Sequence, residues 1–267
     1  MKEYTIFIII LTLIIVAINS PVWGYTIKYS NDIPLVDYGK VIGLQTNPVT
    51  ISNAALALYN DSNNTAMNIF LKSADWIVEH SVSRGNYSVL LYNFPLSIYN
   101  LDKGWISGMA HGIALQVLIK AHEFTGNEKY LYAAKNLLNS FFISVENGGV
   151  KYKDKSGGFW YDEYASNKTQ VKVSRVLNGM MITVLGIYDY WNYTKSPDAK
   201  FLFDKGIVSL KNDLHLYDNN GYSYYDRLGN PAHSTYHQIH IDLARKLYNI
   251  TGESVFKEYS DKWDKND

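Results

Sequence analysis

Residues 157–164, with the sequence GGFWYDEY, place two carboxyl groups and four aromatic side chains directly after a flexible glycine pair. Glu163 and Tyr164 are candidates for proton transfer, because positioned carboxyl and phenol groups act as general acids and bases. Trp160 offers an aromatic face of the kind that suits a sugar ring. The structural alternative for the same residues is an amphipathic hairpin whose aromatic side chains pack in the core.

A second segment, residues 221–227 with the sequence GYSYYDR, combines three tyrosines with an acid and a base. Tyr225 is a further phenol for proton transfer, and Arg227 is suited to a sugar carboxylate because its guanidinium group binds carboxylates in a bidentate fork. The alternative is a surface hairpin in which Asp226 and Arg227 pair with each other.

Three histidines follow at His233, His237 and His240, which share one face of a helix. That spacing suits a metal, but no His-Glu-x-x-His arrangement accompanies it, and we expect neither a metal nor a cofactor. Tyr236 and His240 lie one turn apart. We expect both at the open end of the helix, with the leucines that follow in the core.

Small residues mark two helical segments that can approach a ligand or another helix closely. Residues 105–112 read WISGMAHG and include Trp105 and His111. Asn178 stands next to Gly179 within a second helical pattern, where both residues are locally unfavourable. The pair therefore indicates a site or a tight helix crossing, and plain core packing is the alternative for both segments.

The hydrophobic spacing is helical over most of the chain after residue 47. Helices are expected at about 48–59, from 65 to beyond 77, and at 106–124, 128–145, 172–191, 198–212, 235–250 and 254–264. Short turns join them in antiparallel pairs. This pattern predicts a mainly α fold, an α/α toroid or barrel of about four helical pairs, with short β-hairpin loops at the site end.

Three long loops separate the successive helical pairs, at residues 83–104, 148–166 and 213–233. All three are rich in aromatic and acidic residues. If the helices pair as expected, the loops open on the same end of the toroid. Because binding and catalytic residues are often carried on loops, that end is the expected site.

Residues 1–24 are expected to form a signal peptide or a membrane anchor. Their apolar run from Ile6 to Ile18 is shorter than the about 20 residues of a spanning helix and fits the apolar region of a signal peptide. Both interpretations place the rest of the chain outside the cytoplasm, and six Asn-x-Ser/Thr sequons agree with export.

Residues 25–46 are expected to be an irregular lead-in with a short strand around 36–44, and residues 47–267 to form the helical domain.

Composition excludes several classes of protein. The formal net charge is zero and the pI is about 7.1, so that the chain lacks the basic stripe expected of a nucleic-acid partner. Cysteine is absent, which excludes disulfides and thiolate chemistry. No glycine-rich phosphate loop and no Gly-x-Ser-x-Gly elbow is present.

Several motifs in one order make the chain resemble the C-terminal domain of the D-glucuronyl C5-epimerase family over roughly residues 45–264. They are residues 105–112, 160–164 (WYDEY), 176–179, 186–189, 216–218 leading to 225–226, 236–241 and 255–258. The resemblance implies a helical barrel of four α/α pairs. It also implies inversion of D-glucuronic acid to L-iduronic acid at C5 within a polymer, as in heparan sulfate biosynthesis. Members tend to be dimers, so a homodimer is possible.

The resemblance also implies roles for individual residues. Glu163 and Tyr164 match the family's acid and tyrosine, Tyr225 and Tyr236 match two further tyrosines, and Asn178 matches a substrate-contacting asparagine. Members usually have Tyr-Asp-Leu-Arg where this chain has Tyr-Asp-Arg-Leu, which displaces Arg227 by one position. Animal members also carry long β-rich regions before this domain.

Chemistry agrees with these roles. Removal of the C5 proton beside a carboxylate builds up negative charge, which cations or strong hydrogen-bond donors stabilise. A phenol needs help from its neighbours to act as a base, and we expect that help from Arg227 and His240. Tyr164 and Tyr236 are then the proton-transfer groups, with Glu163 assisting and Tyr225 beside them. The expected substrate contacts are Asn178, Arg227, His240, Trp160, Trp105 and His111.

Three classes of function remain open from sequence. The first is the epimerase acting on a uronic-acid-containing glycan. The second is a polysaccharide lyase or a glycoside hydrolase on the same toroid, the hydrolase using Asp162 or Glu163 together with Asp226. The third is a non-catalytic glycan-binding surface protein. In each case the membrane is contacted only through the N-terminal segment.

Overall fold

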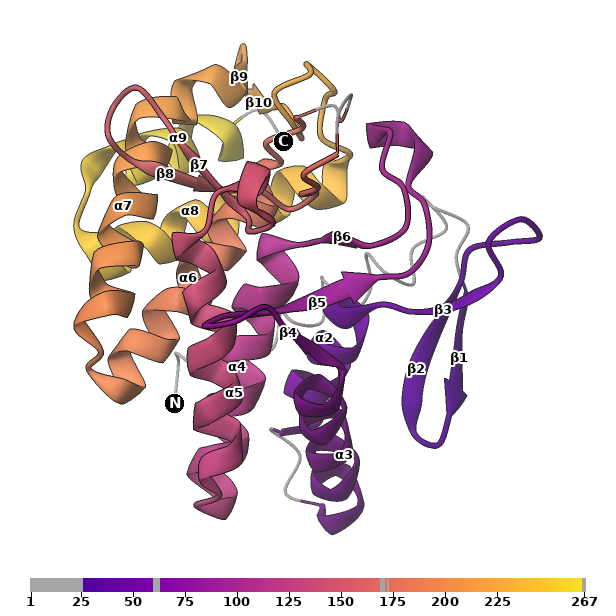
Figure 1. Cartoon of the computed structure of the whole chain (residues 1–267). Coiled ribbons are helices and arrows are strands. Elements are labelled where there is room, and N and C mark those ends of the chain that lie inside the picture. Colours follow the sequence, from indigo (N-terminus) through magenta and orange to yellow (C-terminus); the bar gives the residue numbers. More distant parts are fainter. Residues whose placement is uncertain (1–25, 60–62, 169–170, 172, 266–267) are drawn as a thin grey trace.

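Eight α-helices form four antiparallel pairs within the described part of the chain, residues 26–59, 63–168, 171 and 173–265 of the computed structural model. The expected signal peptide or anchor at residues 1–24 lies outside these residues. No helix within them combines the length and the apolar character needed to cross a membrane. The helical pairs and the short strands at their ends are shown in Figure 1.

The helices form an inner and an outer row. In the inner row α2 contacts α4, α4 contacts α6 and α6 contacts α8, and each outer helix packs on the inner helix that precedes it. The inner helices are α2 (Pro48–Tyr59), α4 (Gly108–Thr125), α6 (Leu177–Thr194) and α8 (Ser234–Thr251). The outer helices are α3 (Asn64–His80), α5 (Glu128–Asn139), α7 (Pro197–Asp213) and α9 (Ser254–Asp264). The predicted arrangement of four helical pairs is confirmed.

Local hydrogen bonds explain where α4 begins and ends. The predicted start at Ile106 is two residues early, because β6 (Trp105–Ile106) pairs with β5 before the helix begins. The Ser107 side chain accepts a hydrogen bond from the Ala110 N–H at 3.1 Å and caps the first turn. Gly126, in the left-handed conformation, ends the helix.

The helix predicted from residue 172 begins only at α6 (Leu177–Thr194). Arg175 has a φ of 46°, a left-handed conformation that an α-helix cannot include. The preceding residues instead lie against the loop before α8, where the Leu177 N–H donates to the Tyr225 carbonyl at 3.0 Å and the Arg227 N–H to the Ser174 carbonyl at 2.9 Å. Two distant loops are joined in this way at one end of the toroid.

A three-stranded antiparallel sheet replaces the expected irregular lead-in. It consists of β1 (Thr26–Ser30), β2 (Ile33–Asp37) and β3 (Leu44–Thr46) in the order β1-β2-β3. Asn31 and Asp32 both have positive φ, which is the backbone of the two-residue turn favoured in hairpins. Residues 34 and 36 of β2 are buried and face the α2–α3 pair.

Further short strands lie at the ends of the helical pairs. In Figure 1, β7 to β10 lie near the top and β4 and β5 near the middle. The expected hairpin within residues 148–166 is present as β7 and β8, whereas α5 is shorter than predicted and gives way to 3₁₀ turns. The strands are β4 (Ser81–Ser83), β5 (Ser88–Tyr92), β7 (Lys151–Lys153), β8 (Phe159–Tyr161), β9 (Asp218–Asn219) and β10 (Tyr222–Ser223). The 3₁₀ turns are η1 (Ser97–Tyr99), η2 (Ser140–Phe142), η3 (Val145–Asn147) and η4 (Leu214–Tyr217).

Glycines let α4 and α6 cross almost in backbone contact. A Cβ atom at Gly112 would lie 2.8 Å from the Thr183 Cα atom, and one at Gly186 would collide with the Gly112 carbonyl oxygen. The small residues of the sequence 105–112 therefore serve a tight crossing. Both helices are buried on nearly all sides, as expected for central helices.

We expect Gly186→Ala to lower the free energy of unfolding by about 1–3 kcal/mol, because the added methyl group has no space and the two helices must separate. Denaturant unfolding followed by circular dichroism measures this change. Asn192→Ala, at an exposed position of the same helix, is the matched control and should stay within about 0.5 kcal/mol. Equal stability of both variants would contradict the assigned crossing.

Candidate active site

A cavity of about 180 Å³ lies at the end of the toroid where all four inner helices begin. Its wall includes one residue from the first turn of each inner helix, Thr50, Met109, Asn178 and Tyr236. Aromatic side chains from the N-terminal sheet and from the loop after β5 complete the wall. We call it the tyrosine cavity, and its aromatic residues are Tyr38, Tyr92, Phe94, Tyr99, Trp105, Tyr164, Tyr225 and Tyr236.

Three of the predicted tyrosines meet in this cavity. The Tyr225 and Tyr236 rings contact edge to face with their centroids 5.0 Å apart. The hydroxyl groups of Tyr164 and Tyr225 share a hydrogen bond. Tyr99 packs against Tyr164, with 4.6 Å between the ring centroids. The segments that sequence analysis selected separately, residues 157–164, 221–227 and the start of α8, therefore form one cluster of phenols.

Glu163 reaches the same cavity from the residues after β8. Its side chain packs over the Cα atom of Gly179, in space that a Cβ atom there would occupy. Burial raises the pKa of Glu163 to about 8, a hydrogen bond with Tyr164 opposes that rise, and the charge of Asp162 adds to it. The acid is therefore protonated over most of the neutral range, and its Oε2 atom has no hydrogen-bond partner among the described residues.

Asp162 lies behind Glu163 and does not line the cavity. Its side chain is fully buried, and this burial raises its pKa to about 7, opposed chiefly by the charge of Arg175. Its carbonyl oxygen accepts a hydrogen bond of 2.8 Å from the Gly108 N–H at the start of α4. Asp162 thus connects the acid-bearing segment to the toroid.

The cavity tyrosines hold their protons strongly. Burial raises the pKa of Tyr164 and of Tyr225 well above the ordinary value of a phenol, and the charge of Glu163 adds to both shifts. The sequence-based expectation that Arg227 and His240 lower these pKa values is not supported, since neither side chain lines the cavity. The phenols are suited to donating protons rather than to being phenolates at rest.

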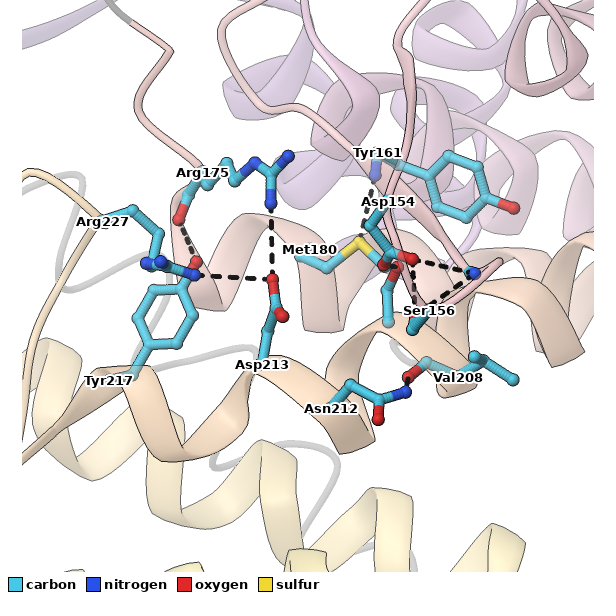
Figure 2. Close-up of polar contacts among 12 residues, drawn as sticks. Asp154, Ser156, Tyr161, Arg175, Met180, Val208, Asn212, Asp213, Tyr217 and Arg227 are labelled. Carbon is cyan, nitrogen blue, oxygen red and sulfur yellow. Dashed lines mark hydrogen bonds and ion pairs between the residues drawn. The ribbon is translucent and has the colours of Figure 1, made fainter.

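Arg227 lies outside the cavity, where it pairs with Asp213. Figure 2 shows that Arg175 and Arg227 both reach the same oxygen atom of the Asp213 carboxylate. The two Nη1–Oδ2 distances are 3.4 and 3.5 Å. The Tyr217 hydroxyl donates to the Arg175 carbonyl beside them at 2.5 Å. The predicted substrate contact by Arg227 therefore has no basis in this arrangement, because the guanidinium group packs against the toroid instead.

Three other predicted contacts are core residues. The His111 Nε2 atom accepts from the Leu90 N–H at 3.0 Å, the Trp160 ring stacks on Tyr217, and His240 Nδ1 lies 2.7 Å from Ser223 Oγ. All three side chains are fully buried away from the cavity. Burial lowers the pKa of His111 and of His240 to about 3, so both are neutral.

The histidine stripe on α8 serves the fold. His233 is the N-cap of α8 and accepts from the Thr235 N–H, while His237 and His240 both lie against Ser223. Within the described residues no group of three or more histidine, aspartate or glutamate side chains is placed to hold a metal ion.

Sequence analysis missed a group of residues on the other side of the cavity. Asn47 accepts from the Val49 and Thr50 N–H groups, caps α2 and donates to the Tyr38 hydroxyl at 2.7 Å. Tyr99 donates to Asp226 at 3.1 Å. An asparagine before a proline is a helix-start signal that marked Asn47, but nothing in the pattern linked it to the distant tyrosines.

None of the described residues that line the cavity is lysine, arginine or histidine. The wall instead offers phenol hydroxyls, one carboxyl group and the Asn178 amide, whose Oδ1 atom has no hydrogen-bond partner among the described residues. The α6 N-cap, Val176, supplies no capping side chain, and the Leu177 N–H donates to the Tyr225 carbonyl instead. The arrangement can donate protons and hydrogen bonds to a ligand rich in oxygen atoms.

We expect Glu163→Gln to gain stability relative to the wild type as pH rises. The folded-state pKa of Glu163, about 8, lies above that of the unfolded chain, so stabilisation by the neutral acid is complete below about 4.5 and is lost as pH rises toward 8. The difference in unfolding free energy should change by roughly 1 kcal/mol per pH unit in that window. Denaturant unfolding between pH 4 and 9 measures it, with exposed Glu128→Gln as control. A pH-independent difference would refute burial of an acid at this position.

Comparisons with known proteins agree with this geometry. The sequence profile described as D-glucuronyl C5-epimerase C-terminus matches residues 84–265. An uncharacterized protein of Methanocaldococcus jannaschii is 33% identical over 247 residues, with 84% of this chain and 79% of the relative covered. The D-glucuronyl C5-epimerase of Caenorhabditis elegans is 32% identical over 214 residues, which are 73% of this chain and 34% of the nematode enzyme. The chain thus spans about a third of that relative's length.

Solved structures share the fold at low identity. A GH76 α-mannanase of Bacteroides thetaiotaomicron superposes with a TM-score of 0.57 at 12% identity, covering 96% of this chain and 71% of its own. The unsaturated glucuronyl hydrolase of Bacillus sp. GL1 has a TM-score of 0.55 at 16% identity, covering 81% of this chain and 60% of its own. Cellobiose 2-epimerase from Bacillus thermoamylovorans superposes with a TM-score of 0.51 at 14% identity, covering 76% of this chain and 53% of its own. These neighbours establish the toroid, and the profile match together with the identities to relatives shows that this chain belongs to the family of the D-glucuronyl C5-epimerase C-terminus.

Proposed function

We propose that this protein epimerises D-glucuronic acid residues to L-iduronic acid at C5 within a glycan. The observation that carries the proposal is the meeting of Tyr164, Tyr225 and Tyr236 around Glu163 in the tyrosine cavity. Family membership supports an epimerase acting on carbohydrate. The uronate substrate and the steps below are our inference from the chemistry of the cavity.

The reaction removes the C5 proton and returns a proton from the other side of the sugar ring. The electron pair of the broken C–H bond moves into the neighbouring carboxylate, which becomes a dianionic, enolate-like group. Inversion therefore needs a base on one face and an acid on the opposite face. Groups that donate hydrogen bonds to the developing negative charge lower the barrier.

Glu163 and Tyr164 together form the proposed base. Tyr164 takes the C5 proton while its own proton passes to the Glu163 carboxylate, with which it is hydrogen-bonded. The raised pKa of Glu163, about 8, makes the carboxylate a stronger base than an exposed glutamate. Tyr236 supplies the proton on the opposite face, because Tyr225 lies between it and Tyr164.

Backbone and amide groups recognise the sugar in this proposal. The start of α6, whose N-cap supplies no capping side chain, attracts the uronate carboxylate, since a helix N-terminus carries a partial positive charge. The unpartnered Asn178 Oδ1 atom accepts a hydrogen bond from a sugar hydroxyl. Trp105, stacked on Tyr92 with a centroid separation of 3.7 Å, gives the cavity a rigid aromatic wall.

A glycoside hydrolase has less support from the cavity. It would need two carboxyl groups on either side of the scissile bond, and Glu163 is the sole carboxyl group that the described residues bring to the wall. Asp226 is buried, where it accepts hydrogen bonds from Tyr99 and from its own loop. A lyase shares the first proton abstraction and differs in its product, which the experiment below detects.

The described sequons agree with a location outside the cytoplasm, which we propose together with the activity. Every sequon asparagine within the described residues is exposed, at Asn63, Asn86, Asn167, Asn192 and Asn249. They are therefore accessible to glycosylation, which takes place on exported proteins.

Incubation with a glucuronic acid polymer in deuterated water is expected to place deuterium at C5 and to produce iduronate signals in the NMR spectrum. Tyr164→Phe and Tyr236→Phe should each lower the exchange rate by about 10²–10⁴-fold, the usual contribution of a positioned acid or base. Tyr132→Phe, at an exposed position, is the control and should leave the rate unchanged. Unsaturated uronate would indicate a lyase instead, new reducing ends a hydrolase, and binding without exchange a non-catalytic protein.

The pH profile of kcat/KM gives a separate check on Glu163. Because the proposed base requires the ionised carboxylate, kcat/KM should rise about tenfold per pH unit up to a pH of about 8 and then level off. Initial rates of C5 exchange at low substrate between pH 5 and 9 measure this. A profile that is flat over that range would exclude Glu163 as the base.

A further inference from the structure

A second cavity, of about 360 Å³, lies between the N-terminal sheet and the α2–α3 pair, and we call it the sheet cavity. On the sheet side it is lined by Tyr29, Pro34 and other residues of β1 and β2. On the helix side it is lined by Asn53 and small or apolar residues of α2 and α3. The profile match begins at residue 84, so this cavity lies outside the matched part of the chain.

The two cavities are neighbours along one line. Thr50 of α2 contributes to the wall of both. On strand β2, Val36 lines the tyrosine cavity and Pro34, two residues earlier on the same face, lines the sheet cavity. The two cavities are therefore separated by one shared wall of β2 and α2, which is short enough for neighbouring residues of one linear polymer to reach both.

Asn53 is the unusual group in the sheet cavity. Its side chain is 2% exposed, and its amide nitrogen has no hydrogen-bond partner among the described residues. A buried amide left unpaired destabilises a protein by about 1–3 kcal/mol. The α2 residues that follow it in the cavity wall are alanine and leucine, and the helix would be more stable with an apolar residue at position 53 as well. The unpaired amide therefore points to a ligand.

The other polar and aromatic groups describe that ligand. Tyr29 lines the cavity, yet its side chain is 68% exposed, so its ring is open to contact. Asp32 at the rim is paired with Lys72, which leaves no net charge there. An aromatic face, a buried amide and a hydroxyl without net charge form the kind of mostly apolar site with few polar groups that binds a small uncharged molecule.

We propose that the sheet cavity is a second saccharide subsite, which holds an uncharged sugar residue of the glycan whose uronate lies in the tyrosine cavity. This inference rests on the proposed function, since it takes the ligand of both cavities to be one glycan. The Asn53 amide donates to a hydroxyl or acetamido oxygen of that sugar, and Tyr29 packs on its ring. The subsite makes the protein prefer long chains to short ones.

Asn53→Leu tests the subsite, with binding of a glucuronic-acid-containing trisaccharide and dodecasaccharide of one alternating repeat measured by isothermal titration calorimetry. We expect the Kd for the dodecasaccharide to rise about tenfold, as for loss of one hydrogen bond to a buried group. The Kd for the trisaccharide should not change. The free energy of unfolding of the free protein should stay equal or increase, because the unpaired amide is gone, and a purely structural asparagine would show the reverse.

Tyr29→Ala is the second variant. Because Tyr29 is exposed, the substitution leaves the folded core intact. It should weaken dodecasaccharide binding several-fold, whereas Tyr132→Ala, which removes an equally exposed tyrosine from α5, should not. Equal effects on both saccharide lengths, or no effect of either variant, would overturn the subsite. Length-dependent binding that these variants weaken, without C5 exchange, would support the subsite and refute the epimerase. C5 exchange without length-dependent binding would support the epimerase and refute the subsite.

Discussion

The close approach of three backbone segments determines where Glu163 and the starts of α4 and α6 lie in the tyrosine cavity. α4 and α6 cross where Gly112 and Gly186 leave no room for a Cβ atom, and Glu163 fills the space over Gly179 at the start of α6. The Gly108 N–H then bonds to the Asp162 carbonyl, which connects the start of α4 to the acid-bearing residues after β8. Because these contacts involve main-chain atoms, the acid and the phenols are held by the fold rather than by flexible side chains.

Close packing at this point also determines the chemistry. Water is excluded from Glu163, so its charged form loses solvation, and the nearby Asp162 adds repulsion. The same burial keeps the cavity phenols protonated. The carboxyl group ionises near neutral pH, whereas the phenols beside it stay protonated. Such a difference in pKa between neighbouring groups lets one act as a base and the other as an acid.

The helices could be predicted because they depend on local patterns, whereas the assignment of the phenols to one site depended on the resemblance to a family. The tyrosine cavity is lined by six of the predicted site residues, Tyr164, Tyr225, Tyr236, Glu163, Asn178 and Trp105.

Arg227 and His240 were assigned to the site on residue type, yet their partners Asp213 and Ser223 come from other loops that no local pattern reveals. His111 and Trp160 lie within motifs that do carry site residues, but their own side chains point into the core. The N-terminal sheet was missed because its signal is a two-residue Asn-Asp turn within short strands.

Charge balance explains how such a cavity works without a lysine, arginine or histidine among its described lining residues. In the proposed reaction the substrate carboxylate and the Glu163 carboxylate together carry two negative charges before the proton leaves C5. Afterwards the sugar carries both, and Glu163 is neutral. The total does not change, and the charge only moves across a short distance. A cation beside the substrate carboxylate would stabilise the dianionic intermediate more than the bound uronate, and in the proposed reaction the phenol hydroxyls of the cavity take that part by donating hydrogen bonds. The start of α6, where Glu163 lies over Gly179, offers its partial positive charge to the Glu163 carboxylate before the proton transfer and to the sugar after it. The substrate and the product of an epimerisation are similar in energy, so the cavity must accommodate the negative charge equally well before and after the reaction.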